Sequence, residues 1–536
     1  MTHVITQACC NDAGCVAACP VNCIHPTPDE PDYLDAEMLY VDPDACIDCG
    51  ACADVCPVGA VTADFELEPG DEPFLELNRR WYADPRHRAA AASARPAAPE
   101  PSDGEASGPL TVAVVGTGPA AQYLVEELAT TRGLQAEITV FERLMTPGGL
   151  VRFGVAPDHR GPKKMADRLG RALRRPGVTV RLGVEVGSDI GIEDLLAAHH
   201  AVVMAVGAAG ERSLGIPGEQ LPGSHTAGEL VGWYNGHPDR FGQTFDLSAR
   251  RAVVVGNGNV ALDVARVLLS APASLTRTDV PANVLEALEA GNIREVLVLG
   301  RRGPDAAAFS AGELLGLERH SALTVTAQRL EPSSDTLGEP AGFKVERLRA
   351  LPGTAPQQGR HLGLRFWSAP VRILGEDRVE AIRVADPRTG ETEDVPCGLV
   401  VRAIGYRGRP VPGLPFDEER GVVPNDAGRV LDTATGRRVA GAYVAGWIKR
   451  GAKGGIGANK MCAKETAAGI VADFLAGRLP TPQTPGTGSG PGLGLKAWEA
   501  IDAHERAAGR AAGRPRVKIA DPEELRRVAL ERGHRP

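Results

Sequence analysis

The sequence predicts an α/β protein with two nucleotide-binding domains that follow a small cysteine-rich module of mixed α and β structure. Two stretches predict the α/β part, because an apolar strand pattern leads into a Gly-x-Gly turn at Gly116 and again at Gly256, and a helical pattern follows each turn. The module is predicted by its cysteines, since nine of the 11 precede Val58. With 536 residues, the chain is long enough for three domains of ordinary size.

The first glycine turn belongs to a complete βαβ unit of the Rossmann type. An apolar strand over 111–115 leads into Gly116-Thr117-Gly118-Pro119-Ala120, and a second strand over 138–142 ends at Glu142. Gly116 permits a tight turn, and Gly118 lets backbone N–H groups at the helix N-terminus approach a pyrophosphate. Glu142 is placed to bind ribose hydroxyls. An ordinary strand-to-helix turn is the alternative, and the acid at the end of the strand disfavours it.

The second unit begins over 251–263, where Gly256, Asn257, Gly258, Asn259 and Val260 form the turn into a helix. The next strand, over 296–300, ends in Arg301-Arg302 instead of an acid. An arginine pair is more often a solvated surface feature, but at this place it favours a 2′-phosphate and therefore NADP. Glu313, on the following helical pattern, can add a contact to the nicotinamide nucleotide.

We expect the second unit to be inserted in the first domain. Apolar segments over 201–208 and 399–406 flank the second unit and resemble the two connections of such an insertion. A late strand over 441–447 then leads into a glycine-rich cationic loop that ends at Lys460. Backbone N–H groups of Gly454, Gly455 and Ile456 can approach a flavin ring there. Trp447 can pack against this ring, with a structural tryptophan as the alternative.

The cysteine spacing predicts iron-sulfur clusters. Cys46-x2-Cys49-x2-Cys52-x3-Cys56-Pro57 is the spacing with which a bacterial ferredoxin loop binds three thiolates to one cluster and the fourth to its neighbour. Combining this group with the earlier cysteines gives two sites. A [4Fe-4S] cluster is expected at Cys19, Cys46, Cys49 and Cys52, and a second cluster, [3Fe-4S] or [4Fe-4S], at Cys9, Cys15 and Cys56.

Two cysteines remain outside this assignment. Cys10 could supply a further ligand or replace Cys9, and Cys23 is interpreted as a packed free thiol. A zinc module is the alternative for the whole cysteine set. It is disfavoured because zinc sites seldom use seven spaced thiols with a proline after the last cysteine of each group.

Charge and composition divide the chain further. Residues 1–75 contain fifteen Asp and Glu and no Lys or Arg, whereas the rest is mildly basic. Simple solvation of the module and electrostatic docking between two parts explain this equally well. Residues 83–108 are rich in Ala, Pro, Ser and Arg without periodicity, which predicts a semi-stiff connector.

The sequence lacks a run that could span a bilayer and lacks the order of a signal peptide, so we expect a cytoplasmic protein without membrane insertion and without a nucleic-acid partner. Asp521-Pro522 predicts the start of a short C-terminal helix. The expected division is a ferredoxin-like module over 1–78, a connector over 79–108, an FAD-binding domain over 109–210 and 404–478, an NADP-binding domain over 211–403, and a C-terminal extension over 479–536.

Two resemblances support this division. The runs from Cys19 to Ile24 and from Tyr40 to Cys46 resemble the seven-iron ferredoxins. Residues 110 to about 475 resemble ferredoxin-NADP reductases of the adrenodoxin-reductase type, and with the module in front the chain is similar to the actinobacterial two-domain enzyme. The matching runs are Gly149 to Arg152, Gly154 to His159, Gly256 to Arg266, Arg301 to Pro304 and Gly446 to Gly451.

The resemblance implies the site residues. FAD would be held by Ala120, Glu142, Leu150, Val186, Trp447 and Gly454 to Ile456, and NADP by Asn257 to Val260, Arg301, Arg302, Glu313 and Gly454. His159 resembles a family residue near the flavin that is suspected of proton handling, and the usual position of its acidic partner corresponds to Gly316. A hydrogen-bonded structural histidine is the alternative.

We therefore expect a ferredoxin-NADP(+) oxidoreductase that passes electrons from NADPH through FAD and the fused clusters to an external acceptor. A flavin is needed because a hydride carries two electrons and a cluster accepts one. The acceptor would be an external ferredoxin or another redox protein, such as a cytochrome P450 system. Three alternatives are an electron-input subunit like that of glutamate synthase, a redox sensor, and a flavin disulfide reductase, which would need a partner for Cys397 or Cys462.

Overall fold

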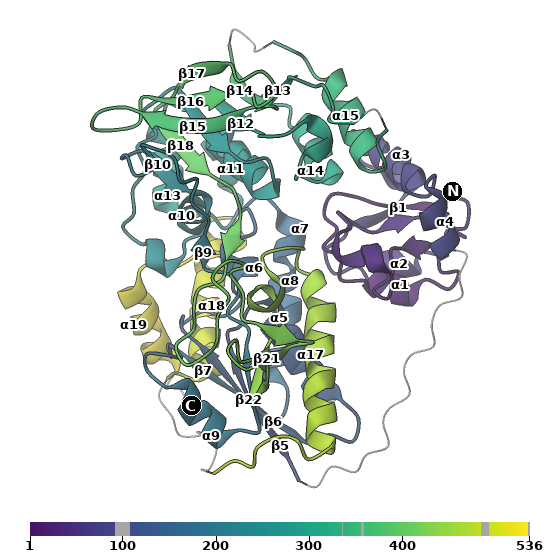
Figure 1. Cartoon of the computed structure of the whole chain (residues 1–536), viewed down its shortest axis with the longest axis vertical. Coiled ribbons are helices and arrows are strands. Elements are labelled where there is room, and N and C mark those ends of the chain that lie inside the picture. Colours follow the sequence, from purple (N-terminus) through teal and green to yellow (C-terminus); the bar gives the residue numbers. More distant parts are fainter. Residues whose placement is uncertain (92–107, 335, 355–357, 484–491, 534–536) are drawn as a thin grey trace.

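The computed structural model of the protein describes residues 1–91, 108–334, 336–354, 358–483 and 492–533 (Figure 1). It contains two large, mainly parallel sheets flanked by helices, with a small module beside both. None of the helices in these described ranges combines the length and the apolar character that crossing a bilayer requires. The predicted α/β class is confirmed.

The N-terminal module consists of two small antiparallel sheets and short helices. Asn78 joins the two sheets, since its Oδ1 accepts from the Val41 amide at 2.8 Å and its Nδ2 donates to the Ile5 carbonyl at 3.0 Å. The strands are β1 (His3–Ile5), β2 (Ile24–His25), β3 (Tyr40–Val41) and β4 (Val61–Ala63), and the α-helices are α1 (Gly14–Ala18), α2 (Ala51–Asp54), α3 (Glu72–Trp81) and α4 (Pro85–Ala91); 3-10 turns η1 and η2 cover Pro31–Leu34 and Asp64–Glu66.

The predicted connector over 79–108 is wrong in its first part. Helix α3 continues to Trp81, and α4 occupies Pro85–Ala91. The Trp81 ring stacks between Tyr40 and His87, with centroid distances of 5.1 and 3.9 Å. The Tyr82 hydroxyl also donates to the carbonyls of Cys23 and Tyr40. This aromatic packing orders a segment whose composition alone predicts an irregular chain, and residues 92–107 of the connector lie outside the described residues.

The first large sheet has seven strands in the order β20-β21-β22-β8-β5-β6-β7, and β22 through β7 run parallel. Alternate residues of its central strand β5 face opposite sides. Val112 and Val114 pack toward α5 and α17, whereas Ala113 and Val115 pack toward α9 and the segment 411–430. The elements are β5 (Leu110–Val115), α5 (Pro119–Thr130), β6 (Ala136–Glu142), α6 (Leu150–Phe153), α7 (Arg160–Lys163), α8 (Met165–Leu169), η3 (Ala172–Arg174), β7 (Val178–Leu182), α9 (Ile192–Ala198), β8 (Ala201–Met204), β20 (Asn425–Asp426), β21 (Arg429–Leu431), β22 (Arg438–Val444), α16 (Trp447–Arg450) and α17 (Ala458–Leu475).

The second large sheet has six parallel strands in the order β10-β18-β11-β12-β14-β13. One face packs against α10, α11, α13 and α14, and the other against the small sheet β15-β16-β17. The elements are β10 (Ser224–Thr226), α10 (Ala227–Tyr234), η4 (Pro238–Arg240), β11 (Arg251–Val255), α11 (Asn259–Leu269), α12 (Pro272–Leu275), α13 (Ala282–Ala290), β12 (Glu295–Leu299), η5 (Pro304–Ala306), α14 (Ala311–Glu318), β13 (Leu323–Gln328), α15 (Ala341–Ala350), β14 (Arg360–Arg365), β15 (Ala369–Leu374), β16 (Ala381–Ala385), β17 (Thr392–Pro396) and β18 (Leu399–Arg402).

A two-stranded ribbon connects the two sheets. The expected connections over 201–208 and 399–406 begin as β8 and β18, which belong to different sheets. The chain then crosses through β9 (Gly210–Glu211) and β19 (Tyr406–Arg407), which pair antiparallel. The second sheet is thus inserted between β8 and β20 of the first.

The C-terminal extension packs on the first large sheet. Leu493 pairs with Leu182 at the end of β7, and α18 (Leu495–Ala511) and α19 (Pro522–Gly533) form a small core of their own. Helix α19 begins at Pro522, so the predicted helix start is confirmed. Inside this extension Glu505 is fully buried, and it pairs with Arg152 at 2.5 Å and with Arg516 at 2.9 Å.

The acidic module docks on both large domains, beside α14, α15 and α17 (Figure 1). Three of its acids form ion pairs there: Glu37 with Lys344 at 2.6 Å, Asp12 with Arg168 at 3.1 Å, and Asp71 with Arg319. Electrostatic docking, one of the two interpretations of the module's charge, is therefore present in the fold.

Candidate cofactor and cluster sites

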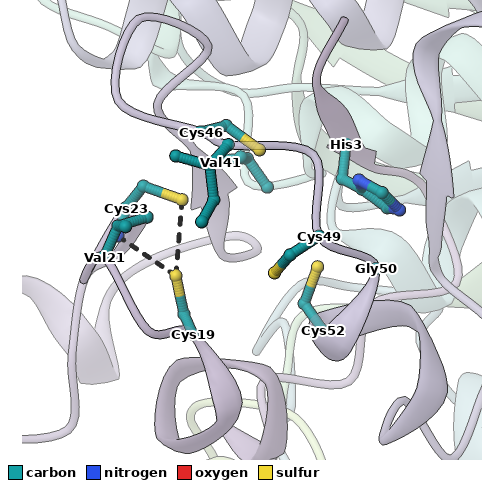
Figure 2. A pocket seen from close by; sticks show the side chains of 10 residues that line it. His3, Cys19, Val21, Cys23, Val41, Cys46, Cys49, Gly50 and Cys52 are labelled. Carbon is teal, nitrogen blue, oxygen red and sulfur yellow. Dashed lines mark hydrogen bonds between the residues drawn. The ribbon is translucent and has the colours of Figure 1, made fainter.

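Four of the predicted cluster ligands line one pocket of the module. Figure 2 shows Cys19, Cys46, Cys49 and Cys52 around it, together with Cys23. Cys19 directly follows α1, and Cys52 lies in α2. The short loop that leads from Cys46 into α2 turns through Asp48 and Gly50, both with positive φ. The turns of this loop direct the thiols of Cys46, Cys49 and Cys52 toward the pocket, where they meet Cys19 from an earlier part of the module.

The chemistry of these thiols fits a metal centre. Burial raises the pKa of Cys52 to about 11, and a charge on Cys46 adds to the effect. Thiols gathered in this way bind a cation as thiolates, because the positive charge of the metal compensates their mutual repulsion. Cys23 Sγ lies 3.4 Å from Cys19 Sγ (Figure 2), so the pocket holds five thiols, one more than a four-ligand cluster needs.

The second predicted ligand group lies on the side of the module that contacts the first large domain. Burial raises the pKa of Cys9 to about 11, with a smaller contribution from Cys56, so these thiols are electrostatic neighbours. Burial also raises the pKa of Cys15, and charges on Cys9 and Cys56 add smaller contributions. Cys10 is buried as well, and its carbonyl accepts from the Gly457 amide at 2.8 Å.

The first glycine turn leaves room for a phosphate group. Gly116 has φ +103°, and a Cβ there would lie 2.6 Å from the Ala205 carbonyl oxygen, so only glycine fits. A Cβ on Gly118 would meet nothing within 4 Å, which leaves the N-terminus of α5, beginning at Pro119, open. Glu142 ends β6 and accepts from the Thr117 hydroxyl and from the Leu144 amide.

The remaining residues predicted to bind FAD come from several segments of the first large domain. Ala120 is buried against Gly446, where a Cβ would come within 2.7 Å of it. Leu150 is 41% exposed at the start of α6. The Trp447 ring stacks on Tyr406 at a centroid distance of 6.0 Å, and its Nε1 donates to the Lys453 carbonyl. Four residues complete the set: Val186 and Ile456 are half-buried, and Gly454 and Gly455 are exposed before α17.

The second glycine turn has the same form. Gly256 has φ +109°, and a Cβ there would lie 2.3 Å from the Ala403 carbonyl oxygen, whereas a Cβ on Gly258 would meet nothing nearer than Ala308 at 4.0 Å. Asn257 precedes Gly258, and Asn259 and Val260 open α11. Arg301 and Arg302 follow β12, are exposed, and form no ion pair with any residue of the described ranges. Two unpaired guanidinium groups beside an open helix N-terminus suit a phosphorylated ribose.

His159 lies where the two large domains and the module meet. Its Nε2 is 3.6 Å from Glu313 Oε2 and 3.7 Å from Asp263 Oδ1, and Arg266 Nη2 approaches the same nitrogen at 2.9 Å. Burial alone would raise the pKa of Asp158, but the Arg266 guanidinium lowers it to about 2. His159 therefore has acidic neighbours from α11 and α14 although the expected partner position is Gly316.

Comparisons with known proteins agree with this geometry. A 4Fe-4S binding domain model matches residues 39–62, and a pyridine nucleotide-disulphide oxidoreductase model matches residues 110–293. A probable ferredoxin/ferredoxin--NADP reductase of Mycobacterium tuberculosis is 46% identical over 100% of this chain and 96% of its own length. The chain belongs to this family of ferredoxin-NADP reductases with a fused N-terminal ferredoxin domain.

Relatives without the module match the rest of this reductase. The mitochondrial NADPH:adrenodoxin oxidoreductase of Bos taurus is 37% identical over 78% of this chain and 91% of its own length. A solved structure of FprA from Mycobacterium tuberculosis, 39% identical, superposes with a TM-score of 0.71 over 79% of this chain and 100% of its own. The fold of the two large domains is thus that of a reductase which stands alone in other proteins.

A disulfide reductase needs a redox-active cysteine pair, and in the described residues Cys397 and Cys462 do not form one. Cys397 is buried against the small sheet β15-β16-β17, whereas Cys462 is buried in α17 and accepts from the Gly446 amide. Both are free cysteines, and they lie in different domains. Within the described ranges, neither forms a redox pair beside the flavin cradle.

Sequence reasoning missed two residues of the reductase site. Thr117, the middle residue of the Gly-x-Gly turn, orients Glu142 through its hydroxyl, and its position between the glycines was the available signal. Gln7 of the module donates to Glu313 at 3.1 Å, and nothing in the local sequence around Gln7 indicates this contact.

Proposed function

We propose that this reductase transfers electrons between NADPH and an external redox protein, with its fused module as the relay. The observation that carries the proposal is the contact between the segment Cys9 to Asp12 of the module and the segment Ile456 to Lys460 of the first large domain. The Gly457 amide donates to the Cys10 carbonyl, Lys460 Nζ donates to the Asp12 carbonyl, and Cys9, Cys10 and Cys56 pack in the same hydrophobic cluster as Ile456.

FAD is proposed to lie along the first glycine turn. Gly116, Gly118, Pro119 and Ala120 would hold its pyrophosphate, and Glu142 its ribose, while Leu150, Val186, Trp447, Gly454, Gly455 and Ile456 would surround the rest. When bound, a flavin supplies the conversion between a hydride and single electrons. The support from this chain is the open space above Gly118 and the strand-end carboxylate that Thr117 orients.

NADP(H) is proposed to bind the second turn through Gly256, Asn257, Gly258, Asn259 and Val260, with Glu313 and Gly454 as further contacts. Arg301 and Arg302 would select the 2′-phosphate over a free hydroxyl. His159 is proposed to take part in proton handling near the flavin, because its Nε2 accepts from Arg266 Nη2 at 2.9 Å and lies 3.6 Å from Glu313 Oε2 and 3.7 Å from Asp263 Oδ1.

The clusters are proposed to follow in a fixed order. The second cluster, [3Fe-4S] or [4Fe-4S], would be held by Cys9, Cys15 and Cys56, with Cys10 as a further or replacing ligand, and would lie nearest the flavin. The [4Fe-4S] cluster would be held by Cys19, Cys46, Cys49 and Cys52. Its pocket opens to solvent at Cys49 and at Ile47, which is 59% exposed, so an external ferredoxin or a cytochrome P450 system would dock there.

Anaerobic titration of the holoprotein with NADPH tests the proposal. We expect flavin bleaching followed by new electron paramagnetic resonance signals from reduced clusters. Clusters that stay oxidised while the flavin is reduced would contradict the relay. As a second arm, protein stripped of its clusters should still reduce ferricyanide but should lose cytochrome c reduction, and an unchanged cytochrome c rate would also count against the relay.

A further inference from the structure

Gln7 belongs to the module, but its side chain lies on α14 of the NADP-binding domain. Its Nε2 donates to Glu313 Oε2 at 3.1 Å, and its Oε1 accepts from Arg319 Nη2 at 3.0 Å. Arg319 in turn pairs with Asp71 of the module. Both polar ends of the Gln7 amide are thus used by α14 and the residue that follows it.

One glycine on α14, Gly316, makes room for this side chain, whereas a methyl group at Gly312 would make an ordinary contact with Gln7. A Cβ on Gly316 would lie 2.3 Å from Gln7 Nε2 and 2.5 Å from its Oε1, so any other residue there would collide with the amide. A Cβ on Gly312, one turn earlier, would lie 3.5 Å from Gln7 Cα. Glycine weakens a helix by about 1 kcal/mol relative to alanine, so the close approach of Gln7 is the physical reason we find for Gly316.

The carboxylate that Gln7 contacts is shared by three parts of the protein. Glu313 is only 8% exposed, and its Oε2 faces Gln7 of the module, His159 of the FAD-binding domain at 3.6 Å and Arg266 of its own domain at 3.7 Å. Among the described residues, Gln7 makes the only hydrogen bond to this carboxylate side chain. A buried carboxylate that loses its hydrogen-bond donor keeps its desolvation cost, so Glu313 would shift toward another neighbouring donor such as Arg266.

We propose that Gln7 is a positioning residue for the NADP site: it holds the Glu313 carboxylate where the nucleotide meets it, so the docked module tightens nucleotide binding. This rests on the proposed contact of Glu313 with NADP. Because coupling between two binding events is reciprocal, bound NADP would also favour the docked module. The fused module would then be part of the nucleotide site as well as an electron carrier.

The test measures NADP+ dissociation constants of the full-length holoprotein by calorimetry. We expect Gln7→Ala to weaken NADP+ binding about tenfold, the typical effect of losing a hydrogen bond to a charged group. Gly316→Ala should weaken it to a similar extent, because its methyl group displaces the Gln7 amide while alanine favours the helix. The double variant should bind no more weakly than either single variant, since both remove the same contact.

Arg80→Ala is the matched control, because Arg80 joins the module to Glu339 and Glu346 without touching Glu313. Its NADP+ affinity should stay within about twofold of the wild type. With ferricyanide as acceptor, Gln7→Ala should raise the KM for NADPH and leave kcat unchanged. The positioning role is overturned if Gln7→Ala binds like the wild type, if Arg80→Ala loses as much affinity, or if the two single effects add.

Glu313→Gln separates this inference from the proposed NADP site. If Glu313→Gln binds NADP+ like the wild type, the proposed contact of Glu313 fails, and the role of Gln7 fails with it. If Glu313→Gln is weakened and Gln7→Ala is not, only the role of Gln7 fails.

Discussion

The Gly457 amide donates to the Cys10 carbonyl at 2.8 Å, which joins the cysteine module to the first residue before α17. The approach is so close that a Cβ on Gly457 would lie 1.9 Å from the Asn11 carbonyl oxygen. The last of the proposed flavin contacts, Ile456, directly precedes Gly457. The contact of Gly457 with Cys10 therefore fixes how near a cluster can come to the flavin.

Gly457→Ala should therefore separate the module from the flavin loop. We expect cytochrome c reduction to fall roughly tenfold to hundredfold, in line with small displacements at other redox and catalytic sites, while ferricyanide reduction and flavin content persist. Gly494→Ala is the control, because a Cβ on Gly494 meets nothing within 4 Å. Equal cytochrome c rates in the two variants would show that the contact does not limit electron transfer.

Cys49→Ser should remove one cluster without unfolding the module, since Cys49 is the exposed thiol of the five around the pocket. We expect a lower iron content and a slower cytochrome c reaction, and a ferricyanide rate within about twofold of the wild type. Cys397→Ser is the control, because Cys397 is buried in the second large domain and does not line the pocket. This variant should keep the iron content of the wild type. Iron analysis and electron paramagnetic resonance decide, and an unchanged iron content in Cys49→Ser would refute the ligand assignment.

Arg301→Ala and Arg302→Ala should lose preference for NADPH over NADH. Each guanidinium is exposed and unpaired within the described ranges, so its removal should leave the fold intact and remove the proposed contact with the 2′-phosphate. A hydrogen bond to a charged group is worth about 1.5 to 3 kcal/mol, which corresponds to roughly tenfold to hundredfold in KM for NADPH. The KM for NADH should stay constant, and a parallel rise for both nucleotides would contradict the assignment.

Glu219 should make the stability of the NADP-binding domain depend on pH. Burial alone would raise the pKa of Glu219, but hydrogen bonds from Ser213, the Leu214 amide and Arg402 lower it to about 2. The pKa of this carboxyl in the unfolded chain is near 4.5. At pH values above it, the lowered pKa of the folded state stabilises the fold by about 3 kcal/mol, and this contribution is lost as pH falls toward 2. The free energy of unfolding should therefore differ between Glu219→Gln and the wild type at pH 7, and the difference should shrink between pH 5 and pH 3.

Urea denaturation followed by circular dichroism measures this difference. Glu376→Gln is the control, because Glu376 is exposed. A difference between Glu219→Gln and the wild type that stays constant from pH 7 to pH 3 would mean that the ionised Glu219 carboxylate is not its source.

Features that depend on near neighbours along the chain can be predicted from the amino-acid sequence alone. The strand before Gly116, the acid at Glu142, the arginines after β12 and the α/β class follow from spacing within a few residues, because glycine turns and strand ends act locally. Cysteine spacing likewise predicted the four expected ligands Cys19, Cys46, Cys49 and Cys52, whereas the structure adds Cys23, interpreted as a packed free thiol, to the lining of the same pocket.

How the parts meet depends on packing between segments that are distant in sequence. Helix α4 forms because Trp81 stacks between Tyr40 and His87, and composition cannot foresee that packing. The contact of Gln7 with Glu313 joins residues 306 positions apart, and the contact of Cys10 with Gly457 joins residues 447 positions apart. Such contacts depend on the shape of both surfaces at once, so they exist only after each domain has folded and docked.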